Sequence, residues 1–303
     1  MGQAQTILAC VIWDRLKTSP ITPGTSGENL GLREITMQKI TSKENEFIKH
    51  VKKLKDKKYR DIEKKYMIEG IKLVAEAIQE KAPIKQIILC DDCEKNEAIP
   101  KDLMYEIAKY ECIYVTEKIF KYLSEVQTPQ GIIAIIERNN QDKEIDYTQD
   151  IIVALDDVQD PGNLGTILRT VDSIGLTQIL VSKGTADAYN PKVVRSTMGA
   201  IFRVKIIECE DLKQTLKEIK KHKFKIVVSS LQTENTIYDI NYNKKVIIIG
   251  NEANGVEKEI QDMADEKIKI PMIGKTESLN ASIATGIILY EYVRQKMRQK
   301  GQV

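Results

Sequence analysis

The chain of 303 residues is nearly neutral, with a net charge of +2, 42% hydrophobic residues and 30% charged residues. This composition excludes a disordered, collagen-like or low-complexity chain. No apolar run reaches the roughly 18 residues of a membrane span, so we expect no membrane partner. At roughly 150 residues per domain, the length predicts about two domains. Binding to nucleic acid would have to depend on local basic patches, since the whole protein carries little charge.

Five widely spaced cysteines predict a reducing, cytoplasmic compartment rather than a disulfide framework. Cys90 and Cys93 form a single C-x-x-C pair, and no second pair follows at the spacing of a zinc site. The two histidines, His50 and His222, lie in no ligand motif. We therefore expect no metal and interpret the cysteine pair as a strand end followed by a turn.

The first two segments of the chain differ in character. Residues 1–36 include a stretch rich in Ser, Thr, Pro and Gly, and we interpret them as a leader, either disordered or left from an expression vector. Residues 37–65 hold eleven Lys and Arg against five acids, a net charge of +6, with apolar residues at helical spacing. The pattern predicts a helix with one apolar stripe and a basic face, which is either an ordinary solvated surface or a phosphate contact.

Short apolar runs then alternate with helical patterns over residues 37–136, which predicts a first, smaller α/β domain. We expect helices at 71–79, 101–109 and 117–124 and strands at 84–90, 113–115 and 131–136. The polar segment 137–150 is interpreted as a linker between domains. Residues 151–303 predict a second α/β domain whose sheet is mainly parallel. Its expected strands are 151–155, 178–182, 202–207, 225–229, 246–250 and 267–270, and its expected helices are 163–174, 190–198, 210–221, 256–263 and 280–299.

Three segments of the second domain are unlike ordinary scaffold. The first, Leu155 to Arg169, runs from a strand through Pro-Gly into a helix that Asn163 could cap, with Arg169 six residues farther on. Such a helix start beside an arginine can bind an anion, although a plain turn with a surface arginine has the same pattern. The spacing of its glycines is not G-x-G-x-x-G, so a dinucleotide-dependent oxidoreductase has little support.

The second segment is a buried strand that ends in Gly250-Asn251-Glu252, where a glycine would allow a ligand close to the backbone. The third segment is Ile270-Pro271-Met272 followed by Ser278-Leu279-Asn280-Ala281-Ser282, with small residues in the helix that Ser278 or Asn280 could cap. Each segment alone is also explained by a tight turn or by close helix packing.

Together and in this order, the three segments resemble the motifs of the SpoU branch of the SPOUT methyltransferases, the TrmH-like RNA ribose 2′-O-methyltransferases. The resemblance covers residues 151–296. Residues 40–136 also resemble that family's N-terminal substrate-binding domain, whereas residues 1–36 have no counterpart.

The resemblance implies a fold and a cofactor. The second domain would be a mainly parallel sheet whose C-terminal part forms a trefoil knot, preceded by the smaller RNA-binding domain, and the enzyme would be a homodimer. S-adenosylmethionine would lie in the knot, held largely by main-chain groups at Gly250, Ile270, Met272 and Leu279. The matching polar residues around the methyl donor and the ribose are Asn163, Arg169, Glu252, Ser278 and Asn280.

The implied reaction is methyl transfer to a ribose 2′-OH in RNA, most simply ribosomal RNA. A tRNA substrate and a non-catalytic RNA-binding protein are the alternatives. A sulfonium methyl is already a strong electrophile, so the protein mainly positions the nucleophile and manages its proton. Guanidinium stays protonated in proteins, so we expect Arg169 to clamp the neighbouring phosphate and stabilise charge on the 2′ oxygen rather than act as a base.

Overall fold

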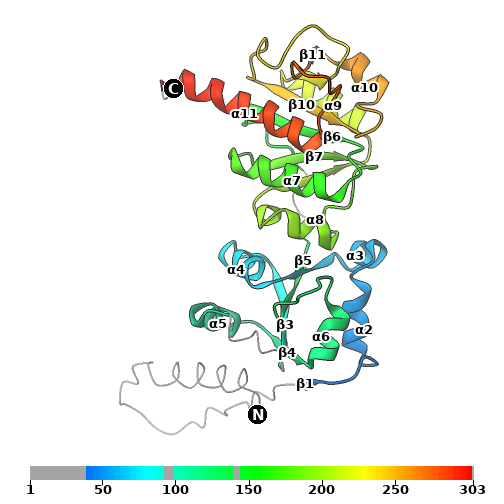
Figure 1. The fold of residues 1–303 in the computed structure, drawn as a ribbon, viewed down its shortest axis with the longest axis vertical. Helices are drawn as coiled ribbons and strands as arrows, with labels where there is room; N and C mark the ends of the chain where they lie inside the picture. Colours follow the sequence, from blue (N-terminus) through cyan, green and yellow to red (C-terminus); the bar gives the residue numbers. More distant parts are fainter. Residues whose placement is uncertain (1–38, 92–98, 139–143, 302–303) are drawn as a thin grey trace. The chain divides into compact units, whose positions relative to one another are not determined.

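The computed structural model describes residues 39–91, 99–138 and 144–301, so the predicted leader, residues 1–36, lies outside the described residues. The chain divides into two compact units, Met1–Arg138 and Asn139–Val303. Among the described residues, no helix is long and apolar enough to cross a membrane. Each unit is described by itself below, with the labels of Figure 1.

Unit 1 is built on a sheet of five strands in the order β1-β4-β3-β5-β2. The pairs β1–β4 and β3–β4 are parallel, whereas β5 runs antiparallel to both β3 and β2. The elements in chain order are β1 (Lys39–Ile40), α2 (Glu46–Lys53), α3 (Lys57–Glu63), β2 (Lys65–Glu69), α4 (Ile71–Gln79), β3 (Ile84–Cys90), α5 (Lys101–Ile107), β4 (Cys112–Val115), α6 (Glu117–Leu123) and β5 (Ile132–Glu137).

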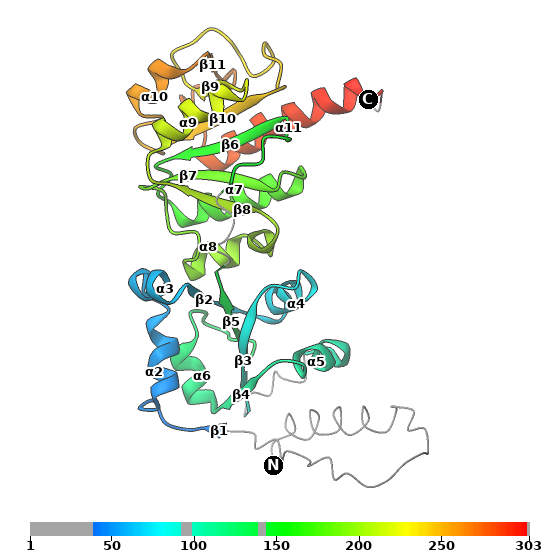
Figure 2. The same ribbon diagram turned by 180° about the vertical axis from the view of Figure 1, so that it is seen from behind.

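Helices cover both faces of this sheet, with α2 and α6 side by side on one face and α4 and α5 on the other (Figure 2). The face under α2 and α6 forms a core because alternate strand residues point to it. Its buried members include Ile48, Val51, Phe120, Ile88 and Ile133.

The basic segment forms two helices, not the one helix that its periodicity predicts. Helix α2 ends at Lys53, and Asp56 caps α3 by accepting a hydrogen bond from the N–H of Lys58 at 3.0 Å. Asp favours such a cap, because its carboxylate satisfies an N–H group that lacks a partner in the first turn. The strand β2 follows directly, in residues for which the sequence analysis predicted no strand.

Unit 2 is built on a sheet of six strands in the order β11-β9-β10-β6-β7-β8, in which every pair is parallel. This confirms the α/β fold with a parallel sheet. The elements are β6 (Ile151–Asp156), α7 (Pro161–Ser173), β7 (Gln178–Ser182), α8 (Pro191–Ser196), the 3₁₀ turn η2 (Ala200–Phe202), β8 (Lys205–Cys209), α9 (Leu212–Lys221), β9 (Lys225–Ser229), β10 (Lys245–Gly250), α10 (Lys258–Met263), β11 (Glu266–Ile268) and α11 (Ala281–Gln299).

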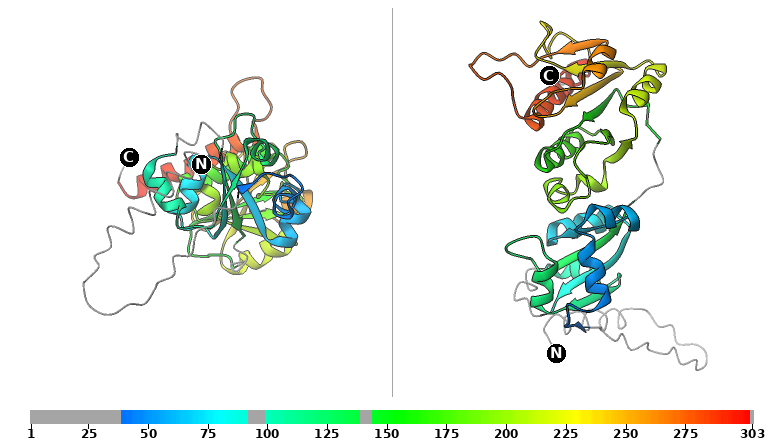
Figure 3. Two further views of the ribbon diagram at one scale, coloured as in Figure 1. Left: turned by 90° about the horizontal axis from the view of Figure 1, so that it is seen from below. Right: turned by 90° about the vertical axis from the view of Figure 1, so that its right-hand side faces the viewer.

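The central strands of this sheet are nearly continuous apolar runs because helices cover both faces. Helices α7 and α11 pack on one face and α9 and α10 on the other, an arrangement that Figure 3 shows from the side. All six residues of β6 and of β10 are buried. Along the chain the strands run outward from β6 to β8 and then cross to the other side of β6, so the carboxyl ends of β6 and β10 meet at the point where the order reverses.

Two local features differ from the predicted elements. Strand β8 begins at Lys205 rather than at 202, because Ala200–Phe202 forms the 3₁₀ turn. Residues 144–149, inside the predicted linker, are held against unit 2: the backbone N–H of Asp146 donates to the side chain of Gln178 at 2.8 Å, and the Tyr147 ring stacks on His222 with centroids 3.6 Å apart.

Candidate active site

The three polar segments meet at the carboxyl edge of the parallel sheet, as expected for loops that follow parallel strands. Here a cavity of about 560 Å³ is lined by the ends of β9, β10 and β11 and by the start of α11. Seven of the predicted site residues line it: Gly250, Glu252, Ile270, Met272, Ser278, Leu279 and Asn280. The cavity lies in the size range of small-molecule sites, and its lining mixes apolar side chains with a few polar groups.

A chain of hydrogen bonds joins one residue from each segment at this cavity. The Asn163 side-chain Nδ2 donates to Glu252 Oε1 at 2.8 Å, and Asn280 Nδ2 donates to Asn163 Oδ1 at 2.9 Å. Asn163 is only 7% exposed, so its amide has a fixed set of partners. These contacts join positions 89 and 117 residues apart, so the fold brings the three motifs into one network.

Glu252 is held as a carboxylate. Burial raises its pKa, but hydrogen bonds from the Asn163 amide and from the backbone N–H groups of Glu252, Gln159 and Asp160 outweigh burial, and the pKa lies below its ordinary value. The donors Gln159 N and Asp160 N lie 3.2 and 3.3 Å from its two oxygens. Glu252 therefore serves as a fixed acceptor that orients the amide of Asn163.

The loop that carries Glu252 folds back on the end of β10. The Asn251 backbone N–H donates to the Gly255 carbonyl at 2.9 Å, and the reverse bond has the same length. A Cβ at position 250 would lie 2.2 Å from backbone atoms of Gly255 and Val256. Gly250 is thus required by this turn of the chain itself, in addition to the close approach of a ligand that the sequence predicts.

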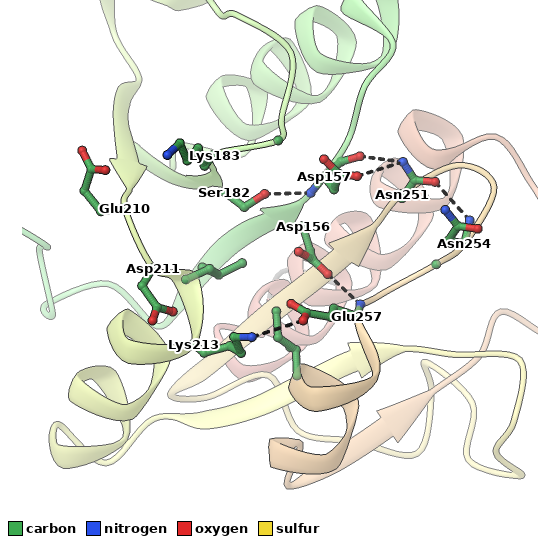
Figure 4. Close-up of a pocket in the computed structure, with 14 residues that line it drawn as sticks. Asp156, Asp157, Ser182, Lys183, Glu210, Asp211, Lys213, Asn251, Asn254 and Glu257 are labelled. Atoms are coloured by element: carbon green, nitrogen blue, oxygen red, sulfur yellow. Dashed lines mark hydrogen bonds and ion pairs between the residues drawn. The ribbon is translucent and has the colours of Figure 1, made fainter.

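Figure 4 shows what anchors the far side of this loop. Asn251 Nδ2 donates to the Asp157 carbonyl at 2.8 Å, while its Oδ1 accepts from the N–H groups of Ala253 and Asn254. Asp156 accepts a bond from the Glu257 N–H at 2.7 Å, and burial raises the pKa of Asp156. These residues line a second cavity of about 580 Å³ at the carboxyl ends of β6, β7 and β8. Their bonds fix the position of Glu252.

The cap of α7 differs from the prediction. Asp160, not Asn163, is the N-cap, and its Oδ1 accepts from the Asn163 N–H at 2.8 Å. Asn163 lies inside the first turn, which frees its side chain to join the network. At the start of α11, Asn280 is the cap and accepts from the N–H groups of Ser282 and Ile283. Ser278 is exposed in the preceding loop and lines the cavity.

The structure does not bring Arg169 into this network. Six residues along an α-helix correspond to about 9 Å along the axis and about 240° around it, so Arg169 and Asn163 face different directions. Arg169 is exposed and has no hydrogen bond or ion pair within the described part of the chain. Its guanidinium is available to an external anion.

The arrangement offers a small-molecule cavity, a fixed amide–carboxylate network at its rim and an arginine with no partner among the described residues. No group of three or more His, Cys, Asp or Glu among the described residues could hold a metal ion. The site therefore suits chemistry in which a reactant is oriented and charge is stabilised.

Comparison with known proteins identifies the family. Residues 150–290 match the model of the SpoU rRNA Methylase family, and residues 45–134 match the MRM3-like substrate binding domain. The 23S rRNA (guanosine(2553)-2′-O)-methyltransferase RlmP of Bacillus subtilis (strain 168) is 34% identical over 84% of this chain and 98% of its own length. The chain belongs to the SpoU rRNA methylase family.

A further relative and a solved structure support the same family. The 23S rRNA (guanosine-2′-O-)-methyltransferase RlmB of Escherichia coli (strain K12) is 30% identical over 76% of this chain and 98% of its own length. The crystal structure of an AdoMet-bound rRNA methyltransferase from Sinorhizobium meliloti superimposes with a TM-score of 0.75 at 30% identity, covering 85% of this chain and 98% of that one. This SpoU family chain is thus an S-adenosylmethionine-dependent methyltransferase.

Sequence analysis missed part of the cavity wall of this SpoU methyltransferase. Residues 229–232, which end β9 and continue just beyond it, and Gln261 of α10 also line the cavity. The signal for residues 229–232 was present, because the polar pair Ser229-Ser230 stands at the end of a buried strand whose carboxyl end lies at the same edge as that of β10.

Proposed function

We propose that this chain transfers the methyl group of S-adenosylmethionine to a ribose 2′-OH of RNA, with ribosomal RNA as the substrate. The observation that carries the proposal is the Glu252–Asn163–Asn280 network at the rim of the small-molecule cavity. The names of the relatives, which are ribosomal RNA 2′-O-methyltransferases, support the same reaction.

The cavity fits the cofactor. Gly250, Ile270, Met272 and Leu279 line it, together with the buried side chains of Ile249 and Ile268. In this proposal, the apolar side chains contact the adenine ring of S-adenosylmethionine. Main-chain groups at Gly250, Ile270, Met272 and Leu279 form hydrogen bonds with the cofactor. S-adenosylmethionine supplies an activated methyl group, so the chain's own residues have to orient the acceptor and stabilise its charge.

Each polar residue then has one task. Arg169 holds the phosphate next to the target ribose and stabilises negative charge on the 2′ oxygen, because its planar fork can make two parallel hydrogen bonds to an oxyanion. The carboxylate of Glu252 fixes the Asn163 amide, and Asn163 in turn positions Asn280. Ser278, exposed at the cavity, contacts the ribose or the methyl donor.

We further propose that the segment from β9 to α11 forms a trefoil knot and that the enzyme is a homodimer. Helix α11 exposes Ile283 and Tyr290, which are 56% and 54% accessible and lie seven residues apart on one side of the helix. The Tyr290 hydroxyl lies 3.4 Å from Ser173 Oγ, so this stripe is continuous with α7. Light scattering should give about twice 34.4 kDa; a stable, active monomer would contradict the dimer.

Unit 1 is proposed to bind the RNA, with the enzyme acting in the cytoplasm. The boundaries are those of the sequence analysis: an RNA-binding domain at 37–136, a linker at 137–150 and the methyltransferase domain at 151–303. The match of residues 45–134 to a substrate binding domain and the basic segment 37–65 support this division.

The test is transfer of labelled methyl groups from S-adenosylmethionine to purified ribosomal RNA, followed by digestion to nucleosides. We expect the label in a 2′-O-methylated nucleoside. A label in a base would contradict the proposal. Methylation of tRNA alone would favour the tRNA alternative, and binding of RNA without transfer would favour a non-catalytic protein.

A further inference from the structure

The basic segment of unit 1 is not a uniform cationic face. Lys49 lies 3.3 and 3.1 Å from the carboxylates of Glu44 and Glu46. Arg60 is buried and donates to the carbonyls of Leu54 and Lys55. Such cations already have partners within the protein. The net charge of residues 37–65 therefore overstates the number of cations that are available to a ligand.

Three other lysines converge where α2 packs beside α6. The ammonium groups of Lys43 and Lys52 lie 4.6 and 4.3 Å from the centroid of the Tyr122 ring, so their nitrogen atoms are at most 8.9 Å apart. Lys52 Nζ donates to the Tyr122 carbonyl at 2.6 Å, and Lys55 Nζ donates to the Ser124 carbonyl at 2.8 Å. The carbonyls belong to residues only two positions apart, which places Lys55 in the same patch.

Part of this convergence has a structural cause. The carbonyls at the end of α6 lack helical partners and carry the negative end of its dipole, which favours cations there. That explains Lys52 and Lys55, but not Lys43, which is exposed and makes no ion pair within the described residues. Each ammonium has three donors, so Lys52 still has two for an external acceptor.

Within the described residues, one acid forms an ion pair with the patch. Glu125 Oε1 pairs with Lys55 at 2.5 Å, whereas Lys43 and Lys52 have no carboxylate within ion-pair distance in the described chain. Burial, followed by the ammonium groups of Lys55 and Lys43 and partly opposed by Glu125, lowers the pKa of Lys52 to about 8. The fold therefore holds these ammonium groups close together in spite of their repulsion, and a bound anion would reduce that repulsion.

We propose that Lys43 and Lys52, supported by Lys55 and bracketing Tyr122, form a subsite for the backbone phosphates of the RNA substrate. The inference rests on the proposed function, since it assumes that unit 1 binds RNA. RNA is the occupant that the geometry favours, because two ammonium groups held within 8.9 Å of each other can contact successive phosphates of one strand rather than one isolated ion. Tyr122 is partly exposed beside them.

The first test compares Lys43→Gln with Lys49→Gln in the full chain. Each variant removes one positive charge, but only Lys43 belongs to the subsite, and neither residue caps a helix. We expect Lys43→Gln to weaken RNA binding several-fold and to reduce the slope of log K against log salt by about one, with Lys49→Gln close to wild type. The value of kcat at saturating RNA should not change, and KM should rise.

Equal RNA affinity and equal salt slopes for the two variants would overturn the subsite. If wild-type protein methylates RNA in that experiment, the proposed function stands and only the subsite fails. If wild-type protein binds S-adenosylmethionine but neither binds nor methylates RNA, the proposed function itself fails. Inorganic phosphate and a heparin competitor in parallel distinguish a generic anion site from an RNA site: displacement of RNA by millimolar phosphate would contradict the two-phosphate contact.

The second test uses the proton of Lys52. Without bound RNA, the pKa of the Lys52 ammonium lies near 8, so Lys52 loses its charge as pH rises through that value. Above that pH, Lys52 must take up a proton when it binds a phosphate. RNA affinity of the wild type should fall about three- to fourfold between pH 7 and pH 8.5, on the linkage of one proton. Lys52→Arg stays charged and keeps donors for the Tyr122 carbonyl, so its affinity should be flat over that range. The same fall in both proteins would overturn the role of Lys52.

Discussion

The two units use polar side chains in opposite ways. In unit 2 the polar residues at the carboxyl edge of the sheet satisfy one another: Glu252, Asn163 and Asn280 form a chain of hydrogen bonds before any substrate arrives. In unit 1, Lys43, Lys52 and Lys55 gather near Tyr122, and of the three only Lys55 forms an ion pair, with Glu125, within the described residues. The first arrangement is preorganised for a reaction, and the second is open to a polyanion.

The difference explains why one unit is expected to carry chemistry and the other affinity. A reacting centre needs groups held in place, because reorganisation during the reaction would add to the barrier. A surface for RNA needs charge, and its contribution is screened by salt. Variants in unit 2 should therefore change turnover or cofactor binding, and variants in unit 1 should change RNA affinity.

The largest effect is expected at Arg169. Arg169→Lys keeps the charge but loses the planar fork, so turnover should fall roughly 10²-fold or more, as for loss of one preorganised donor. Affinity for S-adenosylmethionine should barely change, because Arg169 does not line the cavity. Arg298→Lys, at the exposed end of α11, is the matched control. Full turnover in Arg169→Lys, or a defect mainly in cofactor binding, would contradict this role.

Removal of unit 1 gives the most direct separation of the two functions. A fragment beginning at Glu144 keeps the residues around Tyr147 that pack on unit 2, together with every residue of the cavity. Calorimetry should show unchanged binding of S-adenosylmethionine, while RNA affinity falls at least tenfold and its salt slope flattens. Equal RNA affinity with and without unit 1 would refute the assignment of RNA binding to unit 1.

Gly250→Ala tests whether the loop that carries Glu252 depends on backbone packing. The added Cβ would meet backbone atoms at 2.2 Å, which cannot move as a flexible side chain would. The free energy of unfolding should fall by about 1–3 kcal/mol, as for other overpacked sites, and cofactor affinity should weaken. Gly274→Ala, where nothing lies within 4 Å, is the control and should melt like the wild type. Equal melting temperatures for both variants would show that the loop adapts.

Asn163→Ala should move the acid limb of the pH profile. Asn163 is one of the donors that lower the pKa of Glu252, so its loss raises that pKa and leaves Glu252 protonated up to a higher pH. The acid limb of kcat/KM should shift to higher pH, with a lower plateau. A catalytic histidine is absent from the three motifs, so no step near pH 6.5 is expected. An unshifted limb would mean that the Glu252 carboxylate is not needed.

Deletion of residues 1–36 should have the smallest effect. We expect activity and melting temperature to stay nearly unchanged, because the sequence of this segment has no periodic apolar pattern. A loss of either would show that the leader packs on the fold.

The sequence predicted most of the scaffold because buried parallel strands and amphipathic helices have strong patterns. Helix α4 and strands β3, β7 and β9 have the predicted bounds. The break between α2 and α3 was missed, although the apolar series ends at Leu54 and Asp56 already had the chemistry of a cap. Strand β2 was missed because its short apolar run, Tyr66-Met67-Ile68, lies between two helical patterns and was assigned to no element.

The candidate site was predicted in part. Seven of the nine predicted residues line one cavity, since strand order places the three motifs at one edge. The contacts between them could not be predicted, because the Asn163–Glu252 and Asn163–Asn280 bonds depend on how distant segments pack. The two remaining residues, Asn163 and Arg169, do not line the cavity. Asn163 is connected to it by hydrogen bonds to Glu252 and Asn280. The catalytic roles of these residues stay predictions.

The central claim is that unit 2 methylates a ribose 2′-OH in ribosomal RNA, with Arg169 essential to the reaction. The most direct measurement is to map 2′-O-methylated nucleotides in RNA from cells that lack the gene, complemented with wild-type protein or with Arg169→Lys. The account predicts at least one ribosomal RNA position that is methylated with the wild type and unmethylated in the deletion strain and with Arg169→Lys. Identical maps in all three strains would contradict it.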